Sequence, residues 1–151
     1  MTSRLLLVAL LMTPVAFACK PKIPPATGDE TRSAAGEIVP GITTDDKVSA
    51  KWDAVDWKRF AVNTPTPATV NVYWDNPGVK ARITVRDMFG GPVAEMDHAV
   101  DAPRDTMSGL SLREGTYFLE IEAKGGSSVY TVELFLGDPE AGGSYGVPRP
   151  E

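Results

Sequence analysis

Several kinds of residue are scarce in this 151-residue sequence, and each scarcity excludes a class of site. A single cysteine, Cys19, rules out an internal disulfide, so stability must come from a packed core. A single histidine, His98, together with that cysteine, is too few for a zinc site built from His and Cys ligands. The 15 Lys and Arg residues are outnumbered by 20 Asp and Glu, which argues against a nucleic-acid partner.

A long apolar run near the N-terminus is also missing. The run at residues 5–12 is far shorter than the roughly 20 residues that a membrane-spanning helix needs. It follows the positively charged Arg4 and is closed by Pro14, which breaks a helix. This order is typical of a secretory signal peptide, which we expect at residues 1–18.

The only cysteine lies directly behind this segment. Residues 16–19 read Ala-Phe-Ala-Cys, which resembles the lipobox of bacterial lipoproteins. The resemblance implies cleavage between Ala18 and Cys19, and attachment of a diacylglycerol, with fatty acids such as palmitate, to the Cys19 sulfur. The alternative is an ordinary signal whose removal leaves a free thiol. Lipidation explains an unpaired cysteine in an exported chain better.

The charge of the chain bears on how it is held at a membrane. Removing Arg4 with the signal makes a net charge of −5 still more negative, so attraction to anionic lipid is not expected. We therefore expect the acyl chains to be the membrane anchor. In the lipoprotein family, aspartate after the cysteine signals retention in the inner membrane. Lys20 stands there, so the resemblance implies an outer-membrane lipoprotein whose domain lies in the periplasm or at the cell surface.

Composition divides the rest of the chain into three parts. Residues 19–47 are rich in Pro, Gly, Thr and acidic residues without a regular apolar period, which predicts a flexible tether. Residues 137–151 return to a Gly- and Pro-rich composition and predict a flexible tail. Residues 48–136 carry short alternating apolar runs separated by turn residues, which predicts one folded domain.

The alternating runs of residues 48–136 are typical of half-buried strands. Clear patterns lie at residues 69–74, 81–86, 117–123 and 130–136, and weaker ones at 50–55, 57–62, 92–99 and 106–112. No convincing amphipathic helix interrupts them. They predict an all-β fold, a single antiparallel β-sandwich of about seven or eight strands.

Four segments also carry motifs of a known family: DWKRFAV (56–62), RITVRDMFG (82–90), LREGTYFLEI (112–121) and SVYTVEL (128–134). They resemble the bacterial pre-peptidase C-terminal domain, and the resemblance implies a β-sandwich of jelly-roll type. The sequence departs from the family in two places. Lys58 stands where an inward-facing aromatic residue is usual, and the Asp-Leu-x-Leu signature before the central turn is missing.

Some members of that family bind calcium through acidic clusters. In this chain Asp45, Asp46, Asp53, Asp56 and Asp75 are available but scattered along the sequence. Calcium needs six to eight oxygen ligands from one convergent site. We therefore expect solvated carboxylates, with no metal and no other cofactor.

The sequence shows no catalytic constellation. We expect His98 to lie at a strand end or in a loop as a solvated or capping residue. The glycine pairs 90–91 and 125–126 predict hairpin turns, because neither precedes a helix that carries Lys followed by Ser or Thr. Acidic residues are plentiful enough for a glycosidase pair, but nothing places two of them in one cleft. We expect a protein that is not an enzyme.

Aromatic residues are the better functional lead. Trp52, Trp57, Tyr73, Phe118 and Phe135 fall opposite the predicted core face of their segments. They would form a contact patch for protein or glycan, or would cover the rim of the core. Because Trp57 and Arg59 share one face of a predicted strand, Trp57, Arg59 and Tyr73 are the candidate partner-binding residues.

These observations favour a lipid-anchored envelope protein with a binding role. The first hypothesis is an accessory or scaffold that binds a protein partner in an envelope-spanning assembly, such as a secretion, pilus or motility machine. The second is an adhesive module that binds a polysaccharide or matrix polymer. A hydrolase ranks third.

Overall fold

Nine strands and one short 3₁₀ helix form residues 27–137, the part of the chain that the computed structural model describes. In chain order they are η1 (Arg32–Ala34), β1 (Gly36–Glu37), β2 (Thr44–Ser49), β3 (Val55–Val62), β4 (Thr66–Trp74), β5 (Lys80–Arg86), β6 (Pro92–Asp97), β7 (Arg104–Leu112), β8 (Gly115–Gly125) and β9 (Ser127–Leu136). The all-β prediction is confirmed. Within residues 27–137 no helix is long and apolar enough to cross a membrane.

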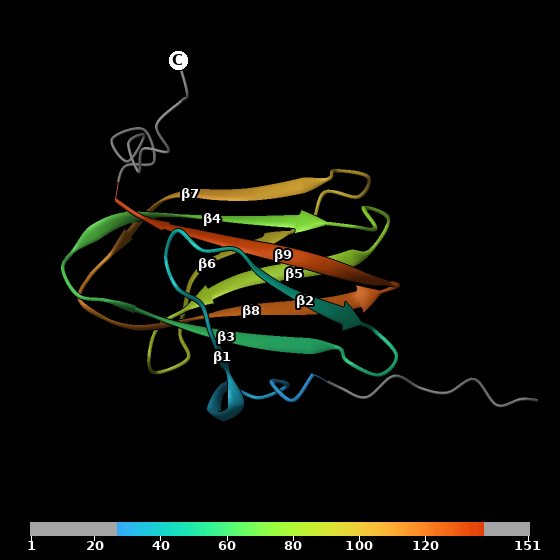
Figure 1. Ribbon diagram of the computed structural model, residues 1–151, viewed down its shortest axis with the longest axis horizontal. Coiled ribbons are helices and arrows are strands. Elements are labelled where there is room, and N and C mark those ends of the chain that lie inside the picture. The colour runs from blue at the N-terminus through green and yellow to red at the C-terminus, as the bar shows by residue number, and fades with distance from the viewer. Residues whose placement is uncertain (1–26, 138–151) are drawn as a thin grey trace, which may run out of the picture.

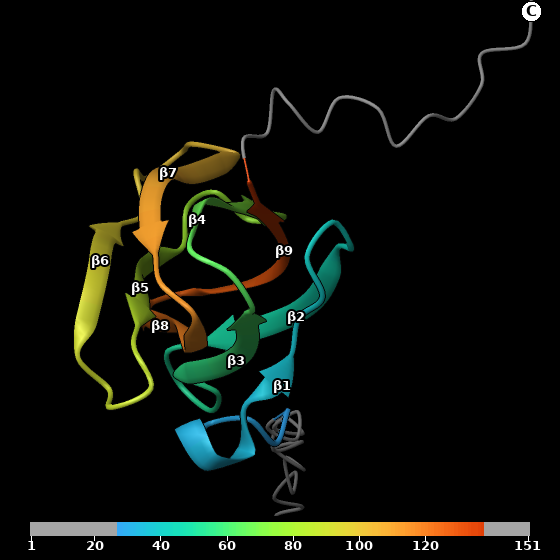
Figure 2. The same ribbon diagram turned by 90° about the vertical axis from the view of Figure 1, so that its left-hand side faces the viewer.

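The strands form two sheets that face each other (Figures 1 and 2). One sheet has the order β1-β3-β8-β5-β6 and the other the order β2-β9-β4-β7. All pairings are antiparallel except the two-residue contact between β1 and β3. With β1 set aside, the eight remaining strands follow the jelly-roll order, in which consecutive strands mostly cross from one sheet to the other. The jelly-roll prediction is confirmed.

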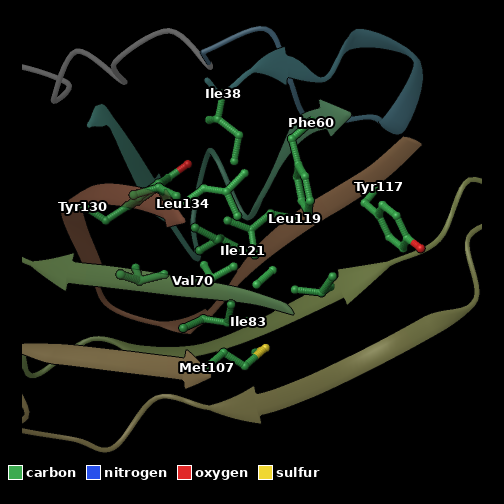
Figure 3. Packing of buried hydrophobic residues seen from close by; sticks show 14 of the residues in the cluster. Ile38, Phe60, Val70, Ile83, Met107, Tyr117, Leu119, Ile121, Tyr130 and Leu134 are labelled. Carbon is green, nitrogen blue, oxygen red and sulfur yellow. The ribbon is translucent and has the colours of Figure 1, made fainter. Parts of the chain in front are cut away.

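The core lies between the two sheets (Figure 3). Ile83 on β5, Leu119 and Ile121 on β8 and Leu134 on β9 are almost fully buried, as their alternating patterns predicted. The ring of Tyr117 stacks on Phe60 with the centroids 5.7 Å apart. Because successive side chains of a strand point to opposite sides, the sequence neighbours of these inward residues point outward. They form the outer face of each sheet.

The expected tether differs from the structure over residues 27–47. Ile38 belongs to the core and its amide donates a hydrogen bond to the Arg59 carbonyl (2.9 Å). The first strand of the four-stranded sheet is β2 at Thr44–Ser49, whereas residues 50–54 connect β2 to β3. The strand was not predicted because two of the three positions on the face of Val48 hold the polar Thr44 and Asp46. The predicted signal peptide at residues 1–18 and the predicted flexible segments at residues 19–26 and 138–151 lie outside the described residues.

Candidate functional site

The structure divides the predicted partner-binding residues between two faces. Trp57 and Arg59 lie on β3 and point outward from the five-stranded sheet, as their shared strand face predicted. Tyr73 lies on β4 and points outward from the four-stranded sheet, on the other side of the sandwich. The three residues therefore form no single site. Ala18 and Cys19 lie outside the described residues.

Trp57 is part of a stack of aromatic and arginine side chains. Its ring meets Phe118 of β8 edge to face, with the centroids 6.2 Å apart and the planes at 75°. The Arg86 guanidinium lies over the Trp57 ring, 5.9 Å from its centroid, and Arg32 lies over Phe118 at 5.7 Å. Both distances are within cation–π range. We call Arg32, Trp57, Arg59, Arg86 and Phe118 the aromatic–arginine face.

Contacts around the aromatic–arginine face fix its arginines in place. The Arg86 guanidinium pairs with Glu120 and donates a second hydrogen bond to the Gly90 carbonyl (3.1 Å). Gly90 has a φ of 90°, and a Cβ added to it would lie 2.7 Å from the Arg32 guanidinium. Glycine at this position thus permits both the turn and the approach of Arg32. Arg86 is therefore held against the sheet by hydrogen bonds within the chain.

The turn between β5 and β6 exposes large apolar side chains beside this face. Phe89 is 83% exposed and Met88 is 55% exposed. The Asp87 carboxylate orders the turn by accepting hydrogen bonds from the amides of Phe89 (2.9 Å) and Gly91 (2.8 Å). Sequence reasoning treated this segment only as a turn. The available signal was its two central apolar residues, at positions where turns usually carry polar ones.

An open groove of about 400 Å³ adjoins the turn. It is lined by Glu37, Arg59, Phe60, Ala61, Met88, Thr116 and Phe118. The groove therefore joins the aromatic–arginine face to the β5–β6 turn.

The outer face of the four-stranded sheet has a different character. The Tyr73 hydroxyl and the Asn71 amide both donate hydrogen bonds to Glu133 Oε2, at 3.0 and 3.1 Å. The Thr106 hydroxyl donates to Asn71 Oδ1 (2.8 Å), and Arg104 lies over the Tyr73 ring. We call these five residues the polar face. Its hydrogen-bonding groups largely satisfy one another.

His98 follows the end of β6 directly, as the expected strand end or loop requires, but it is buried and not solvated. Its Nδ1 lies 2.6 Å from Asp105 Oδ2, and its Nε2 lies 2.9 Å from the Pro77 carbonyl oxygen. The Trp74 indole also donates to Asp105 Oδ2 (2.7 Å). The sequence could not show this arrangement because Trp74, His98 and Asp105 meet only through the pairing of β4 with β7 and the loops beside it. With both ring nitrogens engaged, His98 has a structural role.

The predicted solvated carboxylates are also partly wrong, because Asp53 and Asp56 are buried. Asp29, Asp46 and Asp56 each bring one carboxylate oxygen to a common site, where the three oxygens lie within 4.8 Å of one another. They come from the segment before η1, from β2 and from β3. Folding therefore gathers carboxylates that are far apart in the sequence.

Lys58 provides the positive charge at this site. Its Nζ lies 2.5 Å from Asp29 Oδ2 and also donates to Asp46 Oδ2. Lys58 itself is only 4% exposed. We call Asp29, Asp46, Asp53, Asp56 and Lys58 the lysine cluster. Lys58 stands at a position where the resembled domain usually has an inward-facing aromatic residue. Here the inward-facing side chain is a lysine that contacts two carboxylates.

Burial raises the pKa of Asp56 to about 7, against the lowering effect of a hydrogen bond from the Tyr130 hydroxyl (2.8 Å). Burial also raises the pKa of Asp53. Within the described residues, one oxygen of Asp53 and one of Asp56 are buried without a hydrogen-bond partner. The pKa of Tyr130 is raised by its own burial and by the nearby Asp56. The lysine cluster therefore holds more carboxylate than its single ammonium balances.

The calcium that the family resemblance raises does not fit these residues. An ion bound by Asp29 and Asp46 would occupy the position of the Lys58 ammonium, since both carboxylates already accept a hydrogen bond from it. Two positive charges at that separation would repel strongly in a buried site. Within residues 27–137, this cluster is therefore unsuited to calcium while Lys58 occupies it.

Comparisons with known proteins support the fold. No protein-family model matches the sequence, and no curated protein matches it. The pre-peptidase C-terminal domain of a collagenase from Bacillus anthracis is similar in structure, with a TM-score of 0.57 and 14% sequence identity over 75% of this chain and 99% of that one. A mitogen from Yersinia pseudotuberculosis has a TM-score of 0.46 and 10% identity over 75% of this chain and 100% of that one. The chain thus has a β-sandwich like that of the pre-peptidase C-terminal domain.

Proposed function

We propose that this chain is a lipoprotein of a bacterial outer membrane whose β-sandwich binds another protein through the aromatic–arginine face. Residues 1–18 serve as the export signal, and Cys19 carries the lipid anchor. The domain works in the periplasm or at the cell surface, as an accessory or scaffold of an envelope-spanning assembly such as a secretion, pilus or motility machine.

The observation that carries this proposal is the exposed β5–β6 turn beside an ordered aromatic stack. Phe89 stands 83% exposed next to a groove lined by Met88 and Phe118. Trp and Arg, as found in the adjacent Trp57–Arg86 pair, dominate the energetic centres of protein interfaces. The arginines favour a partner segment that presents carboxylates around an apolar anchor residue.

Two features of the described residues favour binding over catalysis. Both nitrogens of His98 are engaged in the interior, so this residue is not placed to act on a substrate. Asp29 and Asp46 are closed around Lys58 and face the interior rather than a cleft. The exposed chemistry of the aromatic–arginine face is that of a contact surface.

Site-specific photocrosslinking tests which face meets the partner. A photoreactive residue at position 89 should yield one discrete protein adduct in intact cells, and the same residue at position 73 should not. Once the adduct is identified, Phe89→Ala should weaken its binding to the purified chain at least tenfold, because interface anchors are worth about 2 kcal/mol or more. The melting temperature should change little, since the Phe89 side chain is mostly in solvent.

Phe135→Ala is the matched control, because Phe135 is a half-buried aromatic residue on the outer side of the four-stranded sheet. It should leave partner binding unchanged. Equal loss of binding in both variants, or adducts at position 73 alone, would refute the aromatic–arginine face as the contact surface.

A second candidate function is adhesion to a polysaccharide or matrix polymer through the polar face. Tyr73 places an aromatic ring beside Asn71 and Glu133, whose mutual hydrogen bonds would be exchanged for bonds to sugar hydroxyls. Retention on insoluble cell-wall or matrix polymer that Tyr73→Ala abolishes and Phe89→Ala preserves would favour this function over the first.

The lipid anchor is tested independently of the binding face. Cys19→Ser should leave the precursor uncut or release the chain from the membrane. Mass spectrometry of the N-terminal peptide should find a diacylglycerol on Cys19 of the native protein. A free Cys19 thiol on a soluble mature chain would refute the anchor.

A further inference from the structure

The segment of residues 27–38 is attached to the sandwich by few backbone contacts. β1 pairs with β3 over two residues only, Gly36 with Lys58 and Glu37 with Arg59. The Ile38 amide donates to the Arg59 carbonyl, and the Trp57 amide donates to the Asp29 carbonyl, each at 2.9 Å. Figure 1 shows η1 and β1 beside β3 at the edge of the molecule. The buried Ile38 anchors the end of this segment in the core, but a strand of two residues is too short to hold the rest of it.

The Lys58 ammonium adds an ionic contact between the start of this segment and the sandwich. It contacts Asp29 of the segment and Asp46 of β2, while Lys58 itself belongs to β3. β2 and β3 lie in different sheets, so one ammonium joins the segment to both layers of the sandwich. All of these contacts are buried or half-buried, where charge-assisted hydrogen bonds are screened little by salt.

We propose that Lys58 is the built-in cation of this junction and fastens residues 27–38 to the sandwich without a divalent metal ion. Asp29, Asp46 and Asp56 bring carboxylate oxygens within 4.8 Å of one another, an arrangement that a nearby positive charge stabilises. The ammonium lies 2.5 Å from the Asp29 oxygen and so takes the place that a metal ion would need.

The proposal has a consequence for substitutions at this position. Without the ammonium, the three carboxylates would form an acidic pocket of the kind that hard divalent cations bind. With a neutral residue at position 58, the stability of the junction should therefore depend on calcium. The native chain should show no such dependence.

This inference goes beyond the proposed binding function and does not rest on it. It links to that function at one place, because residues 27–38 carry Arg32, which lies over Phe118 of the aromatic–arginine face. Release of the segment would remove Arg32 from that face. The experiments below measure the junction itself and require no partner.

The first experiment measures the melting temperature of the purified full-length chain with excess calcium chloride or with EDTA. The two values should agree within about 1 °C for the native chain. Lys58→Met should melt lower in EDTA, and calcium should raise its melting temperature by about 5 °C or more, as mass action predicts for a ligand that binds only the folded state. Lys51→Met is the matched control, because Lys51 is an exposed lysine near the cluster, and it should behave like the native chain.

Two outcomes of this experiment would overturn the proposal. One is a native chain that EDTA destabilises or calcium stabilises, which would assign the junction to a metal ion. The other is a Lys58→Met variant that melts like the native chain in EDTA.

The second experiment does not depend on how well Lys58→Met folds. Asp29→Asn removes one carboxylate charge from the segment and leaves the sandwich strands unchanged in sequence. Hydrogen exchange at the Ile38 amide should become at least tenfold faster in this variant, whereas the amides of the central strand β8 should keep their protection. Unchanged exchange at Ile38 would show that the ion pair does not hold the segment.

Discussion

Two groups of buried charged residues differ in how completely their charges and hydrogen bonds are balanced. In the first, Asp105 accepts hydrogen bonds from Trp74 and the Ala99 amide and contacts His98. In the second, the lysine cluster, one oxygen each of Asp53 and Asp56 lacks a partner within the described residues. The first group closes loops at one end of the sandwich, whereas the second joins a peripheral segment to it.

The difference shows two uses of buried polar groups in one domain. A carboxylate with all its partners present stabilises a single arrangement and is costly to disturb. A cluster with excess carboxylate responds to protons, because burial disfavours the charged form of the unpaired group. We therefore expect substitutions at Asp105 to destabilise the fold by removing hydrogen-bond partners, and those at Asp56 to change how stability depends on pH.

The largest effect is expected from Asp105→Ala. This change leaves the Trp74 indole and the His98 ring without their buried partner, at a cost of about 3–5 kcal/mol in the free energy of unfolding. Urea denaturation monitored by tryptophan fluorescence measures the loss. Asp75→Ala, at an exposed carboxylate, is the control and should be nearly neutral. A similarly small loss for Asp105→Ala would mean that the hydrogen bonds to Asp105 contribute little to stability. The proposed contrast with the lysine cluster would then be wrong.

The next effect concerns the pH dependence of stability at Asp56. Its folded-state pKa of about 7 exceeds the usual value of 3.8, so the folded chain binds an additional proton between about pH 4 and pH 7. Stability due to this group should therefore fall as pH rises through that window, by up to about 1.4 kcal/mol per pH unit. Asp56→Asn should reduce this slope. Identical slopes for the native chain and the variant in urea titrations from pH 4.5 to 7.5 would contradict this assignment.

A smaller effect is expected from Tyr130→Phe, which removes the hydroxyl that donates to Asp56. The loss should be about 1–3 kcal/mol at pH 8, where Asp56 is mostly charged, because an acceptor is then left buried without a donor. It should be smaller at pH 5, where a proton occupies Asp56, since hydrogen bonds to charged groups are the stronger ones. Equal losses at both pH values would place the effect in packing rather than in the carboxylate.

The smallest effect is expected from Asp97→Asn on the surface. Asp97 pairs with Arg82 at 2.9 Å, and this contact lowers its pKa to about 2. Its contribution is present above about pH 4 and is lost as the pH falls toward 2, the reverse of Asp56. Because solvent screens the pair, the melting temperature at pH 7 should change by no more than about 2 °C. A larger shift in the melting temperature would mean that this exposed ion pair contributes as much to stability as the buried carboxylates do.

Alternation along single strands determined much of this protein from sequence alone. It placed Ile83, Leu119 and Leu134 in the core, and it placed Trp57 and Arg59 together on one outward face. Alternation does not detect β2, because the inward Asp46 breaks the apolar pattern. The sequence therefore predicts a tether where the structure has a strand. Apolar alternation detects strands whose inner face is apolar and overlooks those whose inner face binds a buried charge.

The tertiary structure alone decided which residues share a site. It separated Tyr73 from Trp57 by placing β4 and β3 in different sheets, and it brought Asp29 and Asp46 to Lys58. A strand's side-chain direction is a local property with a period of two residues, so the sequence reports it directly. The pairing of strands and the assignment of each strand to a sheet depend on contacts between distant parts of the chain, which no local pattern encodes.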